Sequence, residues 1–141
     1  MREEVLQFLK QKNPQLCVIA TATPHGKPEA AVMGYAVRDN LILYLSTQKT
    51  TRKYNNLKEN SHVSLVIGWA FAENNVQIDG KSRIIEQGDE YQKTEQFFFA
   101  QNEGAKAFKN SDTVFIEIKP VWIRFMNRTV EPAKITEEIV S

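Results

Sequence analysis

The chain has 141 residues, a hydrophobic content of 42%, and 18 lysines and arginines against 17 aspartates and glutamates, for a formal net charge of +1. This length fits one domain, so a modular architecture is excluded, and the hydrophobic content argues against disorder. The balanced charge excludes a polycation whose overall field would attract nucleic acid or an anionic membrane.

The first third of the chain predicts a helix followed by a meander of strands. Residues 2–12 have apolar positions at helical spacing, glutamates early and lysines late, which favours a short amphipathic helix. Residues 16–23, 28–37 and 41–45 are rich in apolar and β-branched residues, with turn signals between them. These connections are too short for parallel crossovers, so antiparallel strands are expected.

The rest of the chain alternates between strands and two helical regions. Residues 50–60 favour a short helix, residues 62–71 and 76–85 favour strands, and residues 88–108 favour a helical region broken by Gly104. Strands are expected at 113–119 and 121–126, separated by Pro120. About seven strands and two or three helices, with short early connections, predict a small closed or nearly closed antiparallel β-barrel with helices around it. We expect a single domain over residues 1–141, with barrel and helices in about 3–126 and a polar, extended tail in 127–141.

Several kinds of site lack their usual motifs. The six glycines are isolated, so neither a dinucleotide-binding fingerprint nor a P-loop is present, and no G-x-S-x-G motif occurs. His25 and His62 fall in a predicted turn and at a strand start, and no ligand pair has the spacing of a zinc site, so no metal is expected. Cys17 cannot form an internal disulfide and lies among apolar residues, which indicates a buried, unreactive thiol in a cytoplasmic protein.

One local cluster of basic residues opposes a physical rule. Arg52 and Lys53 fall in the first turn of the predicted helix, where a cation opposes the helix dipole at a cost of roughly 0.3–1 kcal/mol each. A bound anion would reverse the sign of that cost, and free backbone N–H groups and nearby hydroxyls would complete a phosphate cradle. The hydroxyls belong to Ser46, Thr47, Thr50 and Thr51. The alternative is a solvated basic surface with Thr50 or Thr51 as the N-cap, and composition does not decide between the two.

Gly34 lies inside the otherwise regular strand predicted at 28–37. A glycine there marks a bulge or tight packing, or it lets a flat group approach the backbone closely. Because residues 41–46 are the expected hairpin partner, the phosphate cradle would lie near the same sheet. A flat aromatic ligand with a phosphate tail would use both features.

The order of the segments carries a family resemblance. The segments are the opening helix, Val18-Ile19-Ala20-Thr21-Ala22, His25-Gly26-Lys27-Pro28, Leu43-Tyr44-Leu45-Ser46-Thr47, Thr51-Arg52-Lys53-Tyr54-Asn55-Asn56-Leu57, Val63-Ser64-Leu65-Val66-Ile67, Val76-Gln77-Ile78-Asp79-Gly80-Lys81-Ser82 and Lys119-Pro120-Val121-Trp122-Ile123-Arg124. Over about residues 3 to 126 the chain resembles the pyridoxamine 5′-phosphate oxidase-like, FMN-binding split-barrel proteins. The resemblance implies a mainly β fold with flanking helices, an antiparallel split β-barrel, and a homodimer with FMN at the subunit interface.

The resemblance also implies the cofactor site. Arg52 and Lys53 would hold the phosphate, with help from Ser46 and Thr47. The edge of the isoalloxazine ring would be lined by Val32, Met33 and Gly34. Further contacts would come from Asn75 or Gln77, and late in the chain from Trp122 and Arg124.

The function implied is a flavin-dependent oxidoreductase that acts on a small-molecule acceptor, with no catalytic residue identified. Where the oxidases proper have an arginine opening the ring-contacting strand, this chain has Ala30 and Ala31, and it ends without their arginine-bearing C-terminal segment. Oxidation of pyridoxamine phosphate is therefore not expected. The alternatives are a non-catalytic flavin-binding or stress-related protein, and the same barrel with haem or a deazaflavin. No nucleic-acid or membrane partner is expected.

The run Phe97-Phe98-Phe99 gives an independent argument for a dimer. Three successive residues span about 200° of a helix, which is too wide for a single buried face. We therefore expect at least one ring to contact a partner surface. The alternative is an irregular stretch with all three rings in the core.

Overall fold

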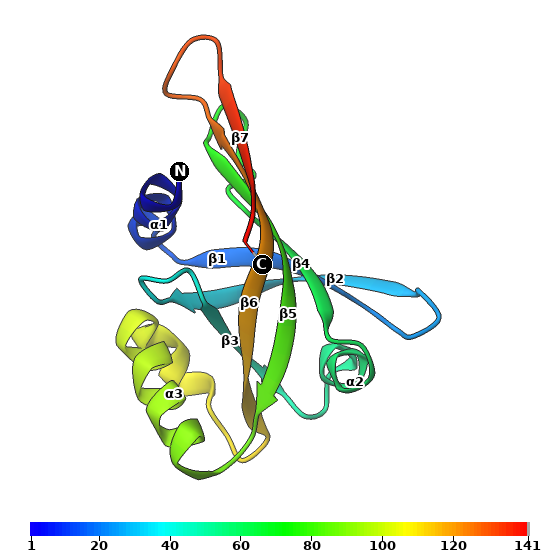
Figure 1. Ribbon diagram of the computed structural model, residues 1–141. Helices are drawn as coiled ribbons and strands as arrows, with labels where there is room; N and C mark the ends of the chain where they lie inside the picture. The colour runs from blue at the N-terminus through cyan, green and yellow to red at the C-terminus, as the bar shows by residue number, and fades with distance from the viewer. Residues whose placement is uncertain (141) are drawn as a thin grey trace.

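One antiparallel sheet closes into a barrel in the computed structural model, which describes residues 1–140 (Figure 1). The elements in chain order are α1 (Arg2–Gln11), β1 (Leu16–Ala22), β2 (Pro28–Val37), β3 (Leu43–Gln48), α2 (Arg52–Glu59), β4 (His62–Ile67), β5 (Asn75–Ile85), α3 (Gly88–Gln101), the 3₁₀ helix η1 (Glu103–Phe108), β6 (Thr113–Asn127) and β7 (Lys134–Ile139). The strand order is β3-β2-β1-β4-β5-β6, and pairing of β3 with β6 closes the ring. The expected mainly β, antiparallel split barrel with flanking helices is confirmed.

Strand β6 holds the barrel together because it has three partners. It pairs with β5 along its length, with β3 through residues 113–118 and with β7 through residues 122–127. Pro120 lies where the β3 partner ends and the β7 partner begins, so it interrupts neither ladder on that side. The two strands expected at 113–119 and 121–126 are therefore one strand.

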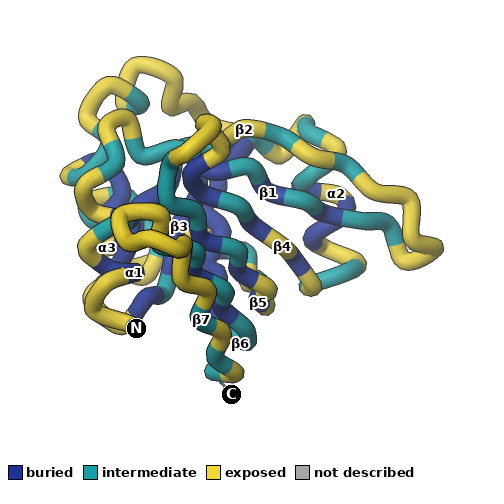
Figure 2. The backbone as a smooth tube through the Cα atoms, turned by 90° about the horizontal axis from the view of Figure 1, so that it is seen from above, coloured by how far each residue is buried: buried dark blue, intermediate teal, exposed yellow. Residues whose placement is uncertain are grey.

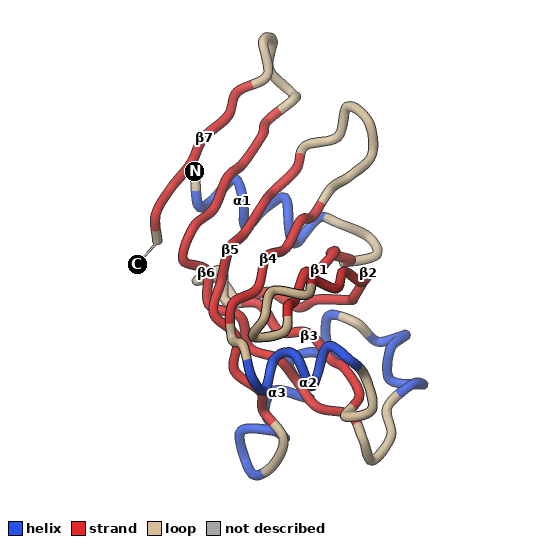
Figure 3. The backbone as a smooth tube through the Cα atoms, turned by 90° about the vertical axis from the view of Figure 1, so that its right-hand side faces the viewer, coloured by secondary structure: helices blue, strands red, loops and turns tan. Residues whose placement is uncertain are grey.

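The polar tail is part of the sheet. Residues 134–139 form β7 and extend the sheet beyond the barrel, next to the second half of β6. The long strands β5 and β6 and the shorter β7 run side by side, with α2 and α3 toward the opposite end of the molecule from the β6–β7 turn (Figure 3). The tail expected to be polar and extended in 127–141 thus contains a strand that was not predicted from the sequence, because β7 depends on cross-strand pairing with β6.

Two glycines are required by their surroundings. An added Cβ at Gly80 would lie 2.7 Å from the Ile118 side chain and 3.0 Å from the Lys119 carbonyl, at the point where the β5–β6 register shifts. Gly68 has a φ of +86° and ends β4 at Ile67, so the strand expected to reach residue 71 is shorter.

Two apolar clusters fill the fold. The larger lies inside the barrel and the smaller lies under α3. In Figure 2 buried segments recur along the strands, while the loops around them are mostly exposed. Phe98 and Phe99 are buried in the smaller cluster, whereas Phe97 is partly buried, with its ring edge-on to Tyr44 at 5.7 Å. Two of the three rings are thus in the core, and the third remains partly open.

Cys17 lies in the barrel core and is fully buried, as expected, and burial raises the pKa of its thiol to about 12. Within residues 1–140 no helix combines the length and the apolar character needed to cross a membrane. The same residues contain no group of three or more histidine, cysteine, aspartate or glutamate side chains arranged to hold a metal ion.

Candidate cofactor site

The start of helix α2 is built by two threonines. Thr51 is the N-cap, and its Oγ1 accepts a hydrogen bond of 3.3 Å from the Tyr54 N–H while its hydroxyl donates to the Gln48 carbonyl at 2.9 Å. The Thr47 hydroxyl lies 3.2 Å from that of Thr51. The structure thus confirms that Arg52 and Lys53 occupy the first turn of a helix, with Thr51 as its cap.

This helix start presents positive charge and free donors. The first turn contains no acidic residue, and the backbone N–H groups of Arg52 and Lys53 have no intrahelical acceptor at these positions. The Arg52 side chain is 71% exposed, and Lys53 makes no ion pair within residues 1–140. We call Thr47, Thr51, Arg52 and Lys53 the α2 cradle. Its donors and cations are those that bind a phosphate at a helix N-terminus.

Strand β2 has an unpaired edge beside the α2 cradle. It pairs with β3 only through Tyr35–Val37, so residues 28–34 pair with β1 alone, and the β1–β2 hairpin projects past the barrel above α2 (Figure 1). The Tyr35 N–H donates to the Gln15 carbonyl at 3.0 Å, and hydrogen-bonded pairs alternate along an antiparallel ladder. The backbone groups of Ala30 and Val32 therefore point away from β1, toward the open side.

The alternation of side chains along β3 separates Ser46 from Thr47, which were predicted together at the phosphate. On β3, Leu43 and Leu45 face the barrel core and Tyr44 faces α3, so Ser46 lies on the α3 side while Thr47 lies with the cradle. The structure therefore does not bring the Ser46 side chain to the hydroxyls of the cradle. This separation could have been predicted from the period of two.

The same alternation applies on β2. Val32 is 57% exposed on the outside of the sheet, whereas Met33 packs against the barrel core. The β1–β2 register is regular through Gly34, which excludes a bulge, and an added Cβ would lie 3.4 Å from the Asn102 side-chain oxygen. In the single chain, Gly34 thus packs closely against the end of α3.

The other residues predicted for the cofactor site lie together on the outer face of β5 and β6; they are Gln77, Trp122 and Arg124. Gln77 is directly opposite Arg124 and Asp79 is opposite Trp122, while the residues between them point into the barrel. The Nε of Arg124 lies 3.5 Å from a carboxylate oxygen of Glu137 on β7. Trp122 and Arg124 lie on the half of β6 that pairs with β7. The α2 cradle lies at the end of β3 and the start of α2, and β3 pairs with the other half of β6.

Asn75 belongs to the same outer group. It lies opposite Met126, and its Nδ2 is 3.9 Å from the Met126 sulfur. Its Oδ1 is buried and accepts no hydrogen bond within the described residues.

Small apolar side chains continue this outer face onto the neighbouring strands. Val32, Val18 and Val66 form one row across β2, β1 and β4, and Ala30 and Ala20 lie in the next row. Val32 and Ala30 are exposed in the single chain. We call Gln77, Trp122, Arg124 and these apolar rows the outer face.

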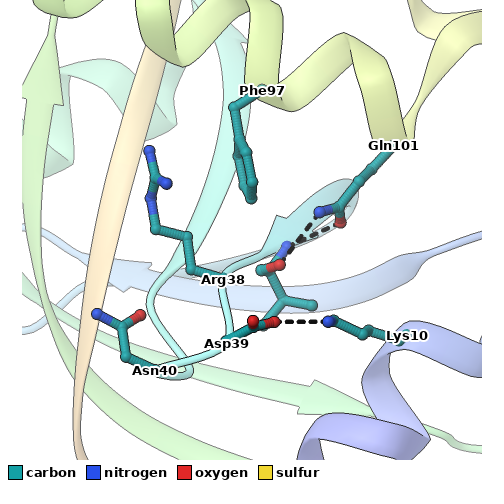
Figure 4. Close-up of a pocket in the computed structure, with 7 residues that line it drawn as sticks. Lys10, Arg38, Asp39, Asn40, Phe97 and Gln101 are labelled. Atoms are coloured by element: carbon teal, nitrogen blue, oxygen red, sulfur yellow. Dashed lines mark hydrogen bonds and ion pairs between the residues drawn. The ribbon is translucent and has the colours of Figure 1, made fainter.

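A separate pocket lies between α1, the β2–β3 turn and α3 (Figure 4). The Arg38 guanidinium stacks on the Phe97 ring at 4.3 Å, and Lys10 pairs with Asp39 at 2.6 Å. The Gln101 amide exchanges hydrogen bonds with the backbone N–H and C=O of Val37. These contacts join α1 and α3 to the barrel, and the pocket contains none of the residues predicted for the cofactor.

Glu29 was missed by sequence reasoning. Its carboxylate lies 3.5 Å from the Arg52 Nε, and its side chain is only 13% exposed. The β1–β2 register, which pairs Glu29 with Thr21, brings the Glu29 side chain to Arg52. No local sequence pattern predicts this contact.

The barrel with an unpaired β2 edge and a basic helix start beside it defines a split-barrel protein. The chain belongs to the pyridoxamine 5′-phosphate oxidase family, whose model matches residues 1–127. The pyridoxine/pyridoxamine 5′-phosphate oxidase of Trichormus variabilis is 33% identical over 76 residues, which cover 54% of this chain and 36% of that protein. The match thus spans little more than a third of the curated relative.

Solved structures share the fold at low sequence identity. General Stress Protein 26 from Bacillus anthracis has a TM-score of 0.73 at 20% identity, covering 97% of this chain and 98% of that one. A pyridoxamine 5′-phosphate oxidase-related, FMN binding protein from Nostoc punctiforme has a TM-score of 0.65 at 12% identity, covering 99% and 92%. A heme binding protein from Mycobacterium smegmatis has a TM-score of 0.73 at 18% identity, covering 88% and 52%. At these identities the likeness concerns the fold alone.

Proposed function

We propose that two copies of this chain bind FMN between them and act as a flavin-dependent oxidoreductase on a small-molecule acceptor. The observation that carries the proposal is the α2 cradle, where two cations occupy the first turn of a helix without any acidic residue of that turn to balance them. Such an arrangement is stabilised by a bound anion. Membership of the pyridoxamine 5′-phosphate oxidase family supports a flavin phosphate as that anion.

The residues present fit the cofactor. The cradle supplies two cations and two free backbone N–H groups for a phosphate. The unpaired backbone groups of Ala30 and Val32 offer donors and acceptors to the polar edge of a flat ring. When bound, FMN supplies the hydride or electron transfer, and the chain binds and orients it.

A second copy explains why the predicted cofactor residues fall into two groups. One chain carries the α2 cradle beside the β2 edge, and it carries Gln77, Trp122 and Arg124 on the outer face of β5 and β6. A two-fold dimer can bring the outer face of one protomer to the cradle of the other. Exposed Val32 and the apolar rows beside it give that interface a nonpolar surface.

No general acid or base is assigned. Burial strongly raises the pKa values of Cys17 and Tyr35, but both side chains lie inside the barrel, where they cannot reach a ligand on its outer surface. Pyridoxamine phosphate is not the substrate we expect because, by the family resemblance, Ala30 and Ala31 stand where the oxidases proper have an arginine. A cytoplasmic location is part of the proposal, and the single buried cysteine supports it.

The test is an absorbance spectrum of the purified protein, followed by titration with FMN and assay with NADH or NADPH and an artificial acceptor. A flavin spectrum with turnover supports the proposal. Flavin binding without turnover would leave a non-catalytic flavin-binding protein, and a Soret band would indicate haem in its place. A protein that neither carries nor binds flavin would refute the proposal.

The dimer is tested separately with Val32→Glu. The side chain is 57% exposed in the single chain, so the change should leave the barrel folded. We expect it to shift the protein from dimer to monomer in light scattering and to weaken FMN binding. An unchanged dimer would place the interface elsewhere.

A further inference from the structure

A single acidic side chain lies against the α2 cradle. Oε2 of Glu29 is 3.5 Å from the Nε of Arg52, and Glu29 is the only acid among the residues that line a small cavity of about 140 Å³ at this point. The Glu29 side chain is 87% buried, whereas that of Arg52 is mostly exposed. The cavity also contains Lys27, whose side chain is exposed.

Glu29 is poorly compensated by its surroundings. Its Oε2 atom is buried and accepts no hydrogen bond within the described residues, so its one close partner is the Arg52 guanidinium. A buried carboxylate oxygen without a hydrogen-bond donor costs free energy, and an ion pair with an exposed arginine offsets little of that cost. Asn56, which also lines the cavity, donates one amide N–H to the Thr21 hydroxyl oxygen at 3.1 Å and not to Glu29.

The Arg52 guanidinium would therefore interact with two anions, the Glu29 carboxylate and the cofactor phosphate. A phosphate bound at the start of α2 needs Arg52, and it would lie within a few ångströms of the Glu29 carboxylate, where like charges repel. The phosphate then competes with Glu29 for Arg52, and a displaced Glu29 carboxylate can turn toward Lys27 or solvent. An uncharged flavin would not meet this repulsion.

We propose that Glu29 competes with the cofactor phosphate for Arg52 and so sets how strongly the site prefers a phosphorylated flavin over an unphosphorylated one. This inference rests on the proposed function, since it concerns the same cradle. It assigns to Glu29 the role of a selectivity residue that weakens phosphate binding. The opposite role, a carboxylate that holds Arg52 in place for the phosphate, predicts the opposite sign.

The test compares Glu29→Gln with the wild type and with Glu59→Gln, using FMN and riboflavin as the two probes. Glutamine keeps the shape of glutamate and removes its charge, and Glu59 is an exposed residue at the far end of the same helix. We expect Glu29→Gln to lower the Kd for FMN about tenfold or more and to leave the Kd for riboflavin within about twofold. Glu59→Gln should change neither.

The outcomes separate this inference from the proposed function. If the wild type binds FMN and Glu29→Gln binds it equally well or more weakly, with an unchanged melting temperature, the inference is overturned and the flavin site stands. An equal gain for riboflavin would also overturn it, because the effect would not depend on the phosphate. If neither protein binds FMN, the proposed function fails and this inference fails with it.

Discussion

Reversing the charge of Lys53 should abolish FMN binding and leave the barrel folded. Lys53 makes no ion pair within residues 1–140, so Lys53→Glu breaks no electrostatic contact in the chain. An acidic residue in the first turn also suits the helix dipole, by roughly 0.3–1 kcal/mol. The melting temperature of the variant should therefore be equal to that of the wild type or slightly higher.

The loss of affinity follows from the charge and place of the residue. At a separation of about 5 Å, two unit charges interact by roughly 0.8 kcal/mol in bulk water and by roughly 3 kcal/mol near a protein surface. The reversal replaces an attraction by a repulsion, which doubles these values for each phosphate charge. Because Lys53 is half-buried, we expect a loss of about 3 kcal/mol or more, which weakens FMN binding at least about 100-fold.

Quenching of flavin fluorescence measures this loss, and circular dichroism checks the fold. The matched control is Lys58→Glu, a charge reversal in the last turn of the same helix. The control should bind FMN like the wild type. If folded Lys53→Glu binds FMN within threefold of the wild type, the reasoning that places the phosphate at the start of α2 is refuted.

Three further predictions concern stability. Gly80→Ala should lower the free energy of unfolding by about 1–3 kcal/mol, because the new Cβ meets β6 at 2.7 Å. Tyr35→Phe should lower it by about 1–3 kcal/mol in urea titrations, because it removes a buried hydrogen bond of 2.6 Å to a carbonyl of α1. Lys12→Met should reduce the loss of stability in acid. The hydrogen bond from Lys12 lowers the Glu73 pKa, so its contribution is present above the ordinary pKa of 4.5 and is lost as the pH falls through the lower folded value.

Each of these stability predictions has a control variant or an outcome that would contradict it. Gly104→Ala places its Cβ in open space, so it should change stability by no more than about 0.5 kcal/mol. A Gly80→Ala variant as stable as Gly104→Ala would contradict the close approach of β5 and β6. Tyr35→Phe with wild-type stability would contradict the buried bond, and an unchanged acid limb in Lys12→Met would contradict the ion pair.

The sequence was sufficient where local patterns decide the structure. The period of two defined the early strands, the charge order defined α1, and the turn residues separated them. Thr51 and Arg52 were predictable as cap and first turn because helix starts have strong local preferences. Burial of Cys17 followed from its apolar neighbours.

Long-range pairing decided what the sequence could not. Strand β7 is held by β6, and β6 continues through Pro120 because its partner changes at that residue. Helix α3 ends before Asn102 rather than at Gly104, since the Asn102 amide donates to the carbonyls of Tyr35 and Phe98. The contact between Glu29 and Arg52 likewise depends on the β1–β2 register and the docking of α2.

Native mass spectrometry of the purified protein with added FMN tests the central claim most directly, because it reports the assembly and its cofactor together. The account predicts a species at twice the 16.2 kDa chain mass that carries two FMN molecules, and loss of that flavin in Lys53→Glu. A monomer that binds FMN would contradict the shared site. A dimer that never takes up flavin would contradict the cofactor.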